Sequence, residues 1–290
     1  MVERAFGSGS AAGSRRREHA TGLLVAFPAV RTVARLSITP VKSMRLQQAE
    51  KIELDPFGVA ENRRFYVAEP DGRLVNGAGF GPLVAIRADY RAQDDGHGEW
   101  LALRFPDQTV VDGDPCHVGA TVETDFFGQS AWGSILEGPW ATALSAYAGR
   151  PLILVRCARP GDANDSASVS IFSTASAEEL ARRSGSDRAL DSRRFRMLLE
   201  VGGSRPHEED EWVGSPVRIG AALVRVLRPV SRCVITTQDP ATGVKDFDTL
   251  KAIAAYRGLR EGRKIDFGVY ADVLEAGTIR VGDPVEPARS

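Results

Sequence analysis

Short alternating runs of apolar and polar residues, separated by tight turns, are the feature that most constrains this fold. From about Val33 to Val122 these runs predict β-strands, and Asp71-Gly72 is expected to join two of them in a hairpin. Residues 100–114, WLALRFPDQTVVDGD, predict another hairpin. Helical patterns do not alternate regularly with these strands, which argues against a doubly wound nucleotide-binding fold. The sequence therefore predicts an α+β protein that is predominantly β, with a compact barrel-like or folded sheet in its first half.

The rest of the chain mixes extended stretches with a few helices. Three segments combine helical spacing with start or stop signals: PWATALSAYAG at 139–149, STASAEELARRSG at 173–185 and DTLKAIAAYRG at 248–258. In the second segment, Ser176-x-x-Glu179 is expected to form a capping box, and in the third Asp248 is expected to cap the helix. Residues 193–201 and 216–237 are predicted to be extended, the latter with a turn in its first part.

The first of these helical segments is expected to be the hinge between two halves of the chain. This divides the chain into an N-terminal β-barrel-like domain at residues 33–137, packed on a β-rich domain with a few helices at residues 138–290. Residues 1–32 are rich in Gly, Ser, Ala and Arg without hydrophobic periodicity, which predicts a disordered tail. The alternative is an export signal, since three arginines at 15–17 precede an apolar run.

Composition narrows the classes of function. The chain has 37 basic and 38 acidic residues, so no strong field would attract nucleic acid or an anionic membrane. No stretch approaches the roughly 18 apolar residues of a membrane-spanning helix. The three cysteines, Cys116, Cys157 and Cys233, are too few and too scattered for a disulfide framework or a zinc site, which favours reducing surroundings. We therefore expect a cytoplasmic monomer without a nucleic-acid or membrane partner.

Cys233 stands in the motif SRCVITTQDPATG. A lone cysteine in an apolar strand is more often a small buried hydrophobe than a reactive group. Here, however, the strand runs into a turn, and Arg228 and Arg232 are expected to favour the thiolate. Such a thiolate suits either a reactive nucleophile or a ligand to a soft or high-valent metal, and the residues by themselves leave both open. Within the turn, Asp239 and Gly243 are expected to have structural roles.

Six segments together resemble one protein family. In chain order they are TPVKS at 39–43, NRRFYV at 62–67, RRFRMLLEVGG at 193–203, SRCVITTQDPATG at 231–243, TLKAIAAYR at 249–257 and FGVYADVLEAGTIRVGDPV at 267–285. Any one segment is a weak signal, whereas six in the same order are specific, and the resemblance spans residues 33–286. The chain is similar to the molybdenum cofactor sulfurase C-terminal (MOSC) domain family with its N-terminal β-barrel partner. That family includes the amidoxime-reducing components and their bacterial counterparts.

The resemblance implies a molybdenum–pterin cofactor, with Cys233 as both metal ligand and catalytic residue. By the same correspondence, five further side chains would bind the cofactor: Lys42, Ser43, Arg64, Arg196 and Ser231. Cations suit the cofactor's phosphate, because Arg offers planar bidentate donors and Lys a point charge. Neighbours on a strand face opposite sides, so only one of Arg63 and Arg64 would reach the site, and Arg64 precedes an aromatic residue as in the family. The other cysteines and the four histidines match nothing and are expected to be structural or exposed.

The implied activity is that of an oxidoreductase that reduces N-hydroxylated compounds, or related N- and S-oxides, with release of water. The sequence contains no C-x₄-C-x₂-C run, so electrons are expected from a separate flavin, haem or iron–sulfur protein. The alternative is a non-redox protein that binds or carries the cofactor or sulfur, and a weaker one is a β scaffold with inert cysteines. Pyridoxal phosphate binding is a further possibility at the level of the family.

One departure from the family concerns the substrate. Relatives usually follow the Phe-Arg pair with Pro-Asn, whereas Met197 and Leu198 stand here. An apolar side chain beside the cofactor predicts a drier pocket or a differently bound segment. Trp212 and the acidic run at 208–211 are expected either to line a loop over the site or, by default, to be solvated surface.

Overall fold

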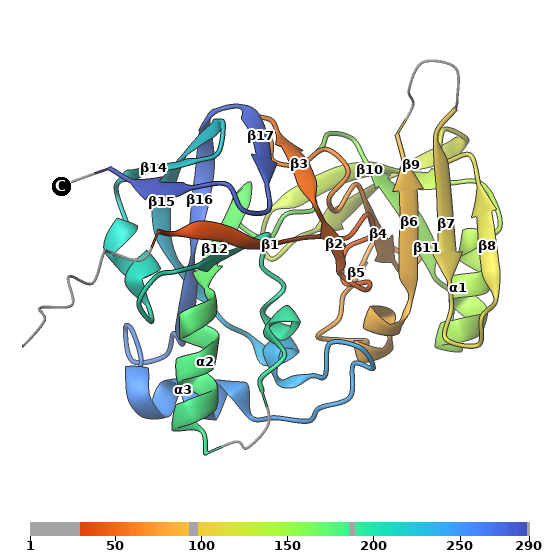
Figure 1. Cartoon of the computed structure of the whole chain (residues 1–290). Helices are drawn as coiled ribbons and strands as arrows, with labels where there is room; N and C mark the ends of the chain where they lie inside the picture. The colour runs from red at the N-terminus through yellow and green to blue at the C-terminus, as the bar shows by residue number, and fades with distance from the viewer. Residues whose placement is uncertain (1–29, 93–97, 186–188, 289–290) are drawn as a thin grey trace, which may run out of the picture.

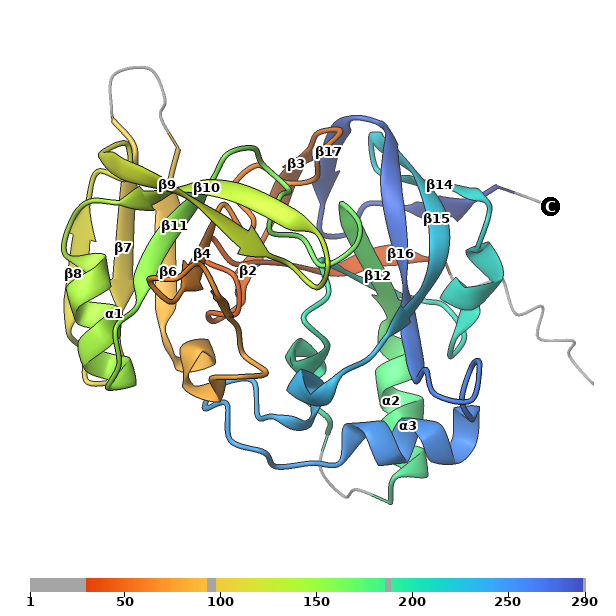
Figure 2. The same cartoon turned by 180° about the vertical axis from the view of Figure 1, so that it is seen from behind.

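The computed structural model describes residues 30–92, 98–185 and 189–288. Nearly all of the tail predicted at residues 1–32 therefore lies outside the described residues, and Thr32 already begins the first strand. The described chain forms two packed groups of sheets with three α-helices (Figures 1 and 2). The prediction of a predominantly β protein with a few helices is confirmed.

The larger group is built on one eight-stranded sheet. Its order is β18 (Val285–Pro287), β14 (Pro216–Ile219), β15 (Ala222–Ser231), β16 (Asp266–Glu275), β12 (Val169–Ser173), β13 (Leu199–Gly202), β1 (Thr32–Ile38) and β2 (Gln47–Ala49). Neighbouring strands run antiparallel, except for the parallel pair β12 and β13. Helices α2 (Thr174–Arg183) and α3 (Thr249–Arg257) pack against this sheet, and we call the assembly the large-sheet unit.

The alternation in the sequence explains the core of this unit. In β15, Ala222, Val224 and Val226 are buried, whereas Arg225 between them is exposed. Side chains of a strand point alternately to opposite faces, so this pattern puts the valines in the core and the arginine in solvent. The turn predicted in this stretch is confirmed, because β14 and β15 pair antiparallel on either side of Gly220.

The smaller group contains two sheets. The order of the five-stranded sheet is β5 (Leu74–Val75), β4 (Phe65–Ala68), β11 (Ile153–Cys157), β10 (Ser130–Leu136) and β9 (Val118–Asp125). The order of the three-stranded sheet is β6 (Arg87–Arg91), β7 (Trp100–Arg104) and β8 (Val110–Gly113). Helix α1 (Trp140–Ala148) packs against β8 and β11, and we call this assembly the small-sheet unit. Both predicted hairpins are confirmed, as β4–β5 and β7–β8. Within the described residues these strands form separate sheets rather than one closed barrel.

The two units are not consecutive along the chain. Strand β1 pairs with β13 of the large sheet, and β3 (Lys51–Leu54) pairs with β17 (Gly277–Arg280). Conversely, β11 pairs with β4 and β10 although it follows residue 137. Helix α1, expected to be the hinge, buries Trp140 and Leu144 in the core of the small-sheet unit. The domain boundary predicted after residue 137 therefore does not coincide with the boundary between the sheets, because α1 and β11 follow that residue and pack with strands of the first half.

Helix ends follow the local signals in two of the three α-helices. Helix α1 ends at Gly149, whose φ of +66° lies in the left-handed region that glycine adopts easily. Asp248 caps α3 by accepting a hydrogen bond from a backbone N–H of the first turn. The capping box predicted at Ser176 is wrong: α2 is capped by Ser173, whose Oγ accepts from Ser176 N at 3.1 Å. Ser176 lies inside α2, where its oxygen accepts from the His207 N–H at 2.8 Å and its hydroxyl donates to the buried Glu209 carboxylate.

Short 3₁₀ segments correct the prediction that residues 193–201 and 216–237 are extended throughout. The segment η2 (Ser192–Phe195) precedes β13, and η4 (Val234–Thr237) follows β15. A further segment, η3 (Glu208–Trp212), contains the acidic run. Its Glu209 is fully buried and Trp212 is 4% exposed, whereas Glu211 is exposed, so only part of this run is solvated surface and none of it lines the cavity described below.

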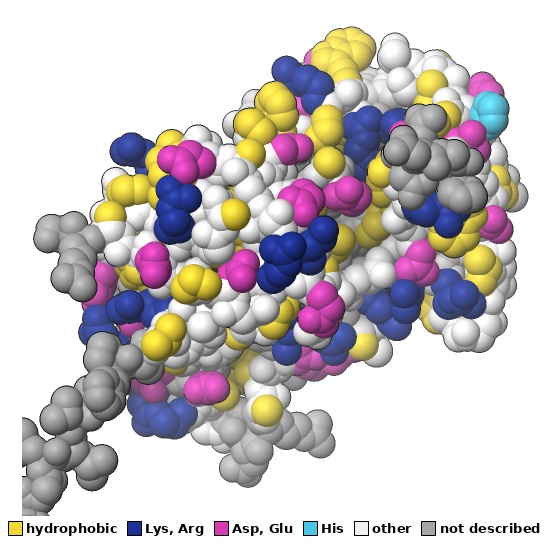
Figure 3. Space-filling view, turned by 45° about the horizontal axis from the view of Figure 1, so that its top comes forward, with side chains coloured by type: hydrophobic (Ala, Val, Ile, Leu, Met, Phe, Trp, Pro, Cys, Tyr) yellow, Lys and Arg dark blue, Asp and Glu magenta, His cyan; other side chains and the backbone are white. Residues whose placement is uncertain are grey.

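The outer surface has mixed charge on the face shown in Figure 3. Basic and acidic side chains are interspersed over it, and no large area of one sign is visible there. This agrees with the near-zero formal net charge of −1. Among the described helices, none is both long enough and apolar enough to span a bilayer.

Candidate functional site

A cavity of about 370 Å³ lies between the two units and is lined by residues from both. The segment between β1 and β2 contributes Lys42 and Ser43, and the turn before β4 contributes Arg63. From the large-sheet unit come Arg196, which directly follows η2, and Cys233, which directly precedes η4. The long strand β15 thus delivers Cys233 to a place where segments distant in sequence meet. Cys233 is solvent-exposed, so its thiol is accessible to a ligand.

The structure brings five of the six predicted site residues to this cavity: Lys42, Ser43, Arg196, Ser231 and Cys233. Arg64 is not among the lining residues, and its Nη1 donates to the carbonyl oxygen of Cys157 at 2.7 Å. Its neighbour Arg63 lines the cavity instead. The argument from strand alternation did not apply, because Arg63 has a left-handed φ of +54° and β4 begins only at Phe65.

Sequence reasoning missed Asp165, which lies on the segment between β11 and β12. Its Oδ1 is 2.6 Å from Nζ of Lys42, and its Oδ2 is 2.7 Å from Nη1 of Arg63. Desolvation raises the pKa of this carboxyl, but the charges of Arg63 and Lys42 outweigh that effect and hold the pKa well below its usual range. The sequence signal that could have found Asp165 is its position in a polar loop between two strands. Functional residues are common in such loops, but this signal does not distinguish Asp165 from the other polar residues of the loop.

Two of the cations are held where burial disfavours their charge. Burial lowers the pKa of Lys42 to about 8, although Asp165 opposes this shift. Burial also lowers the pKa of Arg196 to about 9, and the nearby charge of Arg63 adds to the effect. An anion bound beside these side chains would relieve the penalty, because an opposite charge stabilises the protonated form.

Arg232 is a third, half-buried cation, adjacent in sequence to Cys233. Its guanidinium lies 5.2 Å from the ring centroid of Phe195, donates to the Phe195 carbonyl oxygen, and places Nη1 3.4 Å from the sulfur of Met197. Its buried Nε has no hydrogen-bond partner among the described residues. Burial lowers the pKa of Arg232. A buried donor without a partner costs free energy, and Arg232 carries this cost in the wall of the cavity.

The charges of the cavity do not balance. Among the described lining residues, four cations face one carboxylate, namely Lys42, Arg63, Arg196 and Arg232 against Asp165. Unpaired buried charge is unfavourable, and a ligand that carries several negative charges would compensate it. A phosphate-bearing cofactor with a thiolate-bound metal fits this donor set, because the cavity offers cations and hydroxyls for the phosphate and a thiol for the metal.

The departure at Met197 and Leu198 is visible in the same cavity. Both residues line it, and each is 4% exposed. Met197 lies between Arg232 and the backbone of Gly268. A Cβ at position 268 would come within 2.8 Å of the methionine methyl group, so the side chain of Met197 packs closely on this glycine. Leu198 packs into the core of the large-sheet unit. A sulfur and an alkyl chain therefore stand beside the cations, which supports the interpretation of a drier pocket.

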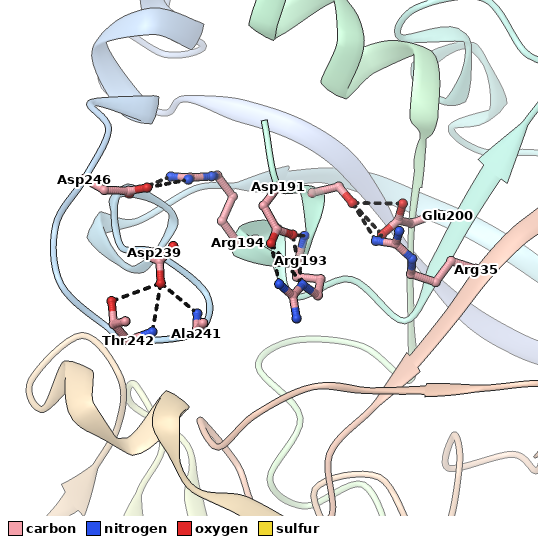
Figure 4. A network of polar contacts seen from close by, with 10 residues as sticks. Arg35, Asp191, Arg193, Arg194, Glu200, Asp239, Ala241, Thr242 and Asp246 are labelled. Carbon is pink, nitrogen blue, oxygen red and sulfur yellow. Dashed lines mark hydrogen bonds and ion pairs between the residues drawn. The ribbon is translucent and has the colours of Figure 1, made fainter. Parts of the chain in front are cut away.

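Ion pairs fix the segment that carries Arg196, as Figure 4 shows. Arg193 pairs with Asp191, and Arg194 donates through both terminal nitrogens to Asp246 at 3.1 and 3.0 Å. The arginines of this motif therefore divide by role: these two hold the segment in place, whereas Arg196 reaches the cavity.

The turn after η4 is built as expected. Asp239 accepts hydrogen bonds from two backbone N–H groups and from the Thr242 hydroxyl (Figure 4). Gly243 has a φ of +75° and approaches Gly81 so closely that a Cβ would lie 2.1 Å from the carbonyl oxygen of Gly81. Of the other cysteines, Cys157 is buried, which raises its pKa to about 12, and Cys116 is exposed.

Comparison with known families decides the classification. The MOSC N-terminal beta barrel domain matches residues 30–132, and the MOSC domain matches residues 159–286. The chain belongs to the MOSC domain family. The resemblance that six short segments carried is thereby confirmed. Helix α1 and the whole of β11 fall between the two matched ranges.

Curated relatives match over most of their length. Mitochondrial amidoxime reducing component 2 of Bos taurus is 27% identical over 290 residues, covering 88% of this chain and 83% of the relative. Mitochondrial amidoxime-reducing component 1 of Xenopus laevis is 27% identical over 288 residues, covering 87% and 81%. Among solved structures, the YUAD protein from Bacillus subtilis matches with a TM-score of 0.42 at 13% identity, covering 89% of this chain and 95% of that chain. A likeness at that score carries no argument about the site.

Proposed function

We propose that this protein is a molybdenum-cofactor-dependent reductase of N-hydroxylated compounds. The observation that carries the proposal is the cavity, which gathers an accessible cysteine and four cations from both units around a space of about 370 Å³. Similarity to proteins named as amidoxime-reducing components supports reduction of an N–O bond as the reaction class.

The residues that would hold the cofactor follow from their chemistry. Lys42, Arg63 and Arg196 would face the phosphate, and the Ser43 and Ser231 hydroxyls would add neutral hydrogen bonds. The Cys233 thiolate would be the protein's ligand to the metal. When bound, the cofactor supplies the exchange of two electrons and accepts the oxygen of the substrate.

The chain's own side chains tune this site. Arg232 places a positive charge next to Cys233 in the sequence, and both residues line the cavity. Tyr270 lines the cavity, and burial raises its pKa, so it keeps its phenolic proton at neutral pH. Met197 and Leu198 limit the water around the reacting bond. This chain thus contributes thiolate, charge and exclusion of water.

A separate electron donor is part of the proposal, and it would be a flavin, haem or iron–sulfur protein. The rival function is a non-redox carrier of the cofactor or of sulfur. The exposed Cys233 would serve such a carrier equally well as a docking thiol. Monomeric state, cytoplasmic location and the absence of nucleic-acid or membrane partners stay predictions, and no feature described above supports pyridoxal phosphate binding.

The deciding experiment is anaerobic incubation of the molybdenum-loaded protein with a chemically reduced viologen. The panel contains N-hydroxylated bases together with S- and N-oxides, and viologen oxidation is followed by absorbance. We expect turnover of at least one N-hydroxylated compound above the rate of the Cys233→Ala variant. Silence across the panel from fully loaded protein, together with transfer of the cofactor to a second apoprotein, would establish the carrier instead.

A further inference from the structure

The tip of the β9–β10 hairpin has an unusual residue at a position of positive φ. Backbone hydrogen bonds in both directions join Phe126 and Gln129, at 2.7 and 3.2 Å, so the turn between them has two residues. These are Phe127, with a φ of +57°, and Gly128, with a φ of +90°. Two-residue hairpin turns of this kind favour Asn, Asp or Gly at the first position. A phenylalanine there is disfavoured by its backbone and needs another explanation.

Anchoring of the hairpin does not supply that explanation. The neighbouring Phe126 is 5% exposed and packs edge-to-face on Tyr66, with ring centroids 4.9 Å apart. Asp125 accepts a hydrogen bond from the Gly128 N–H at 2.6 Å. These contacts fix the tip, whereas the side chain of Phe127 is 66% exposed and belongs to none of the core clusters.

Phe127 instead lies at the rim of the cavity that contains Cys233. It lines this cavity, and together with Asn76 it also lines a neighbouring groove outside it, which places both residues at the boundary between the two. Figure 2 shows the β9–β10 hairpin extending from the small-sheet unit toward the large-sheet unit. Ala78 is a further exposed lining residue close to Asn76 in sequence. The rim that these three residues form is uncharged, whereas the interior carries the four cations.

We propose that Phe127 is a specificity-determining residue, whose ring packs against a planar aromatic substituent of the substrate at the rim of the cavity. The inference rests on the proposed function, since it assigns the reducible N–O group to the interior beside Cys233 and the substituent to the rim. A rigid, well-anchored tip with an exposed ring suits such packing because little conformational entropy is lost on contact. Offset or edge-to-face packing of two rings adds affinity beyond the area that they bury.

The test compares two probes and four variants of the molybdenum-loaded protein. Benzamidoxime carries an aromatic ring on the N-hydroxylated group, and acetamidoxime carries only a methyl group. Phe127→Ala removes the ring, Phe127→Asn removes it while supplying a residue that suits positive φ, and Phe127→Tyr restores it. Trp132→Ala is the matched control, because Trp132 is a 54%-exposed aromatic residue on the same hairpin that does not line the cavity. Binding is measured by calorimetry without reductant, and turnover separately with reduced viologen.

For both Phe127→Ala and Phe127→Asn, the Kd of benzamidoxime is expected to rise about threefold to tenfold, with an unchanged Kd for acetamidoxime. Phe127→Tyr and Trp132→Ala should match the unmodified protein for both probes. Equal changes for the two probes, no change in either ring-removing variant, or an effect on turnover with reduced viologen but not on binding would overturn the inference. Absence of viologen oxidation for every compound in the unmodified protein would count against the proposed function instead, since the two binding constants are read without turnover.

Discussion

The cations of the cavity fall into two regions that differ in their partners. Before β4, Lys42 and Arg63 share the carboxylate of Asp165, and Lys42 also donates to the carbonyl oxygen of Ala163 at 2.8 Å. Around η2 and η4, Arg196 and Arg232 form no ion pair with a described carboxylate. Within the described part of the chain, the Arg196 side chain has one hydrogen-bond partner, the backbone carbonyl oxygen of Met44 at 2.7 Å.

This difference in partners predicts which cations can bind an anion without sharing their donors with an existing partner. A cation that is already paired must share its donors, so its net contribution to a new ligand is smaller than its charge suggests. A buried cation without an acid partner gives up little when an anion arrives, and its desolvation has already taken place. The region around η2 and η4, which also carries Cys233, is therefore expected to dominate retention of the cofactor.

The largest effect is expected at Cys233 itself. Replacement by serine removes the thiolate that the proposed function assigns to the metal. Loss of an outer-shell partner of a metal site typically costs about tenfold to a hundredfold in affinity, so loss of the ligand should cost more. Molybdenum per chain, measured by mass spectrometry after expression in a host that makes the cofactor, should fall sharply in Cys233→Ser. Equal metal content and an unchanged metal spectrum would exclude Cys233 as a ligand.

The next effect compares one cation from each region. Arg196→Ala is expected to weaken cofactor retention about tenfold to a hundredfold, the range for a lost charge-assisted hydrogen bond. Lys42→Ala should weaken it less, because two of the three Lys42 donors already serve Asp165 and Ala163. Cofactor content after dialysis is the measurement, with thermal unfolding to show that both variants fold. A greater loss from Lys42→Ala than from Arg196→Ala would reverse the comparison.

A smaller effect separates the adjacent arginines before β4. Arg63 lines the cavity and shares Asp165, whereas Arg64 donates to the carbonyl oxygen of Cys157 outside it. Arg63→Ala is expected to reduce cofactor retention several-fold, up to about tenfold, and Arg64→Ala should stay within about twofold of the unmodified protein. The pair serves as its own control, since both changes remove the same charge at neighbouring positions. A stronger effect of Arg64→Ala would restore the assignment made from the sequence.

The smallest effect is a pH dependence in the paired region. The pKa of Lys42 is lowered to about 8, so Lys42 is mostly charged at pH 7 and loses its charge as the pH rises through that value. Affinity of the cofactor-free protein for sulfate, an anion that does not titrate in this range, should therefore fall by less than about tenfold from pH 7 to 8.5. Lys42→Arg keeps its charge over this interval and should remove most of the fall. An unchanged profile in that variant would assign the dependence to another group.

Much of the fold could be predicted because its signals are local. Alternation placed β15, the Asp71-Gly72 turn placed the β4–β5 hairpin, and Asp248 with Gly258 bounded α3. These signals act within a few residues and hold whatever the surrounding structure is. The capping box at Ser176 failed for the opposite reason, since the Ser176 oxygen accepts from the N–H of His207, a partner 31 residues away in the chain.

Five of the six predicted cofactor and metal residues line the cavity because the motifs that carry them lie at the ends of strands or in connecting segments. Asp165 escaped prediction because one aspartate in a polar loop looks like any other until the loop is folded over Lys42 and Arg63. Arg232 was expected only to favour the thiolate, and its packing on Phe195 with an unpartnered Nε could be seen only in the assembled structure.

The sequence by itself determined the strand-rich class, the turn and cap positions, the family, and the motif that holds Cys233, since each depends on residues close together in the chain. Tertiary structure alone decided which of Arg63 and Arg64 faces the cavity and which cations pair with Asp165. It also decided that β1 joins the large sheet, whereas β11, from the second half of the chain, joins the small-sheet unit. The physical reason is that the direction of the Arg63 side chain depends on the left-handed backbone of Arg63 in its turn. That conformation is held by a hydrogen bond to a distant residue, from Arg63 N to the carbonyl oxygen of Thr39 at 2.7 Å. Strand pairing likewise depends on which apolar faces remain uncovered once the rest of the chain has packed.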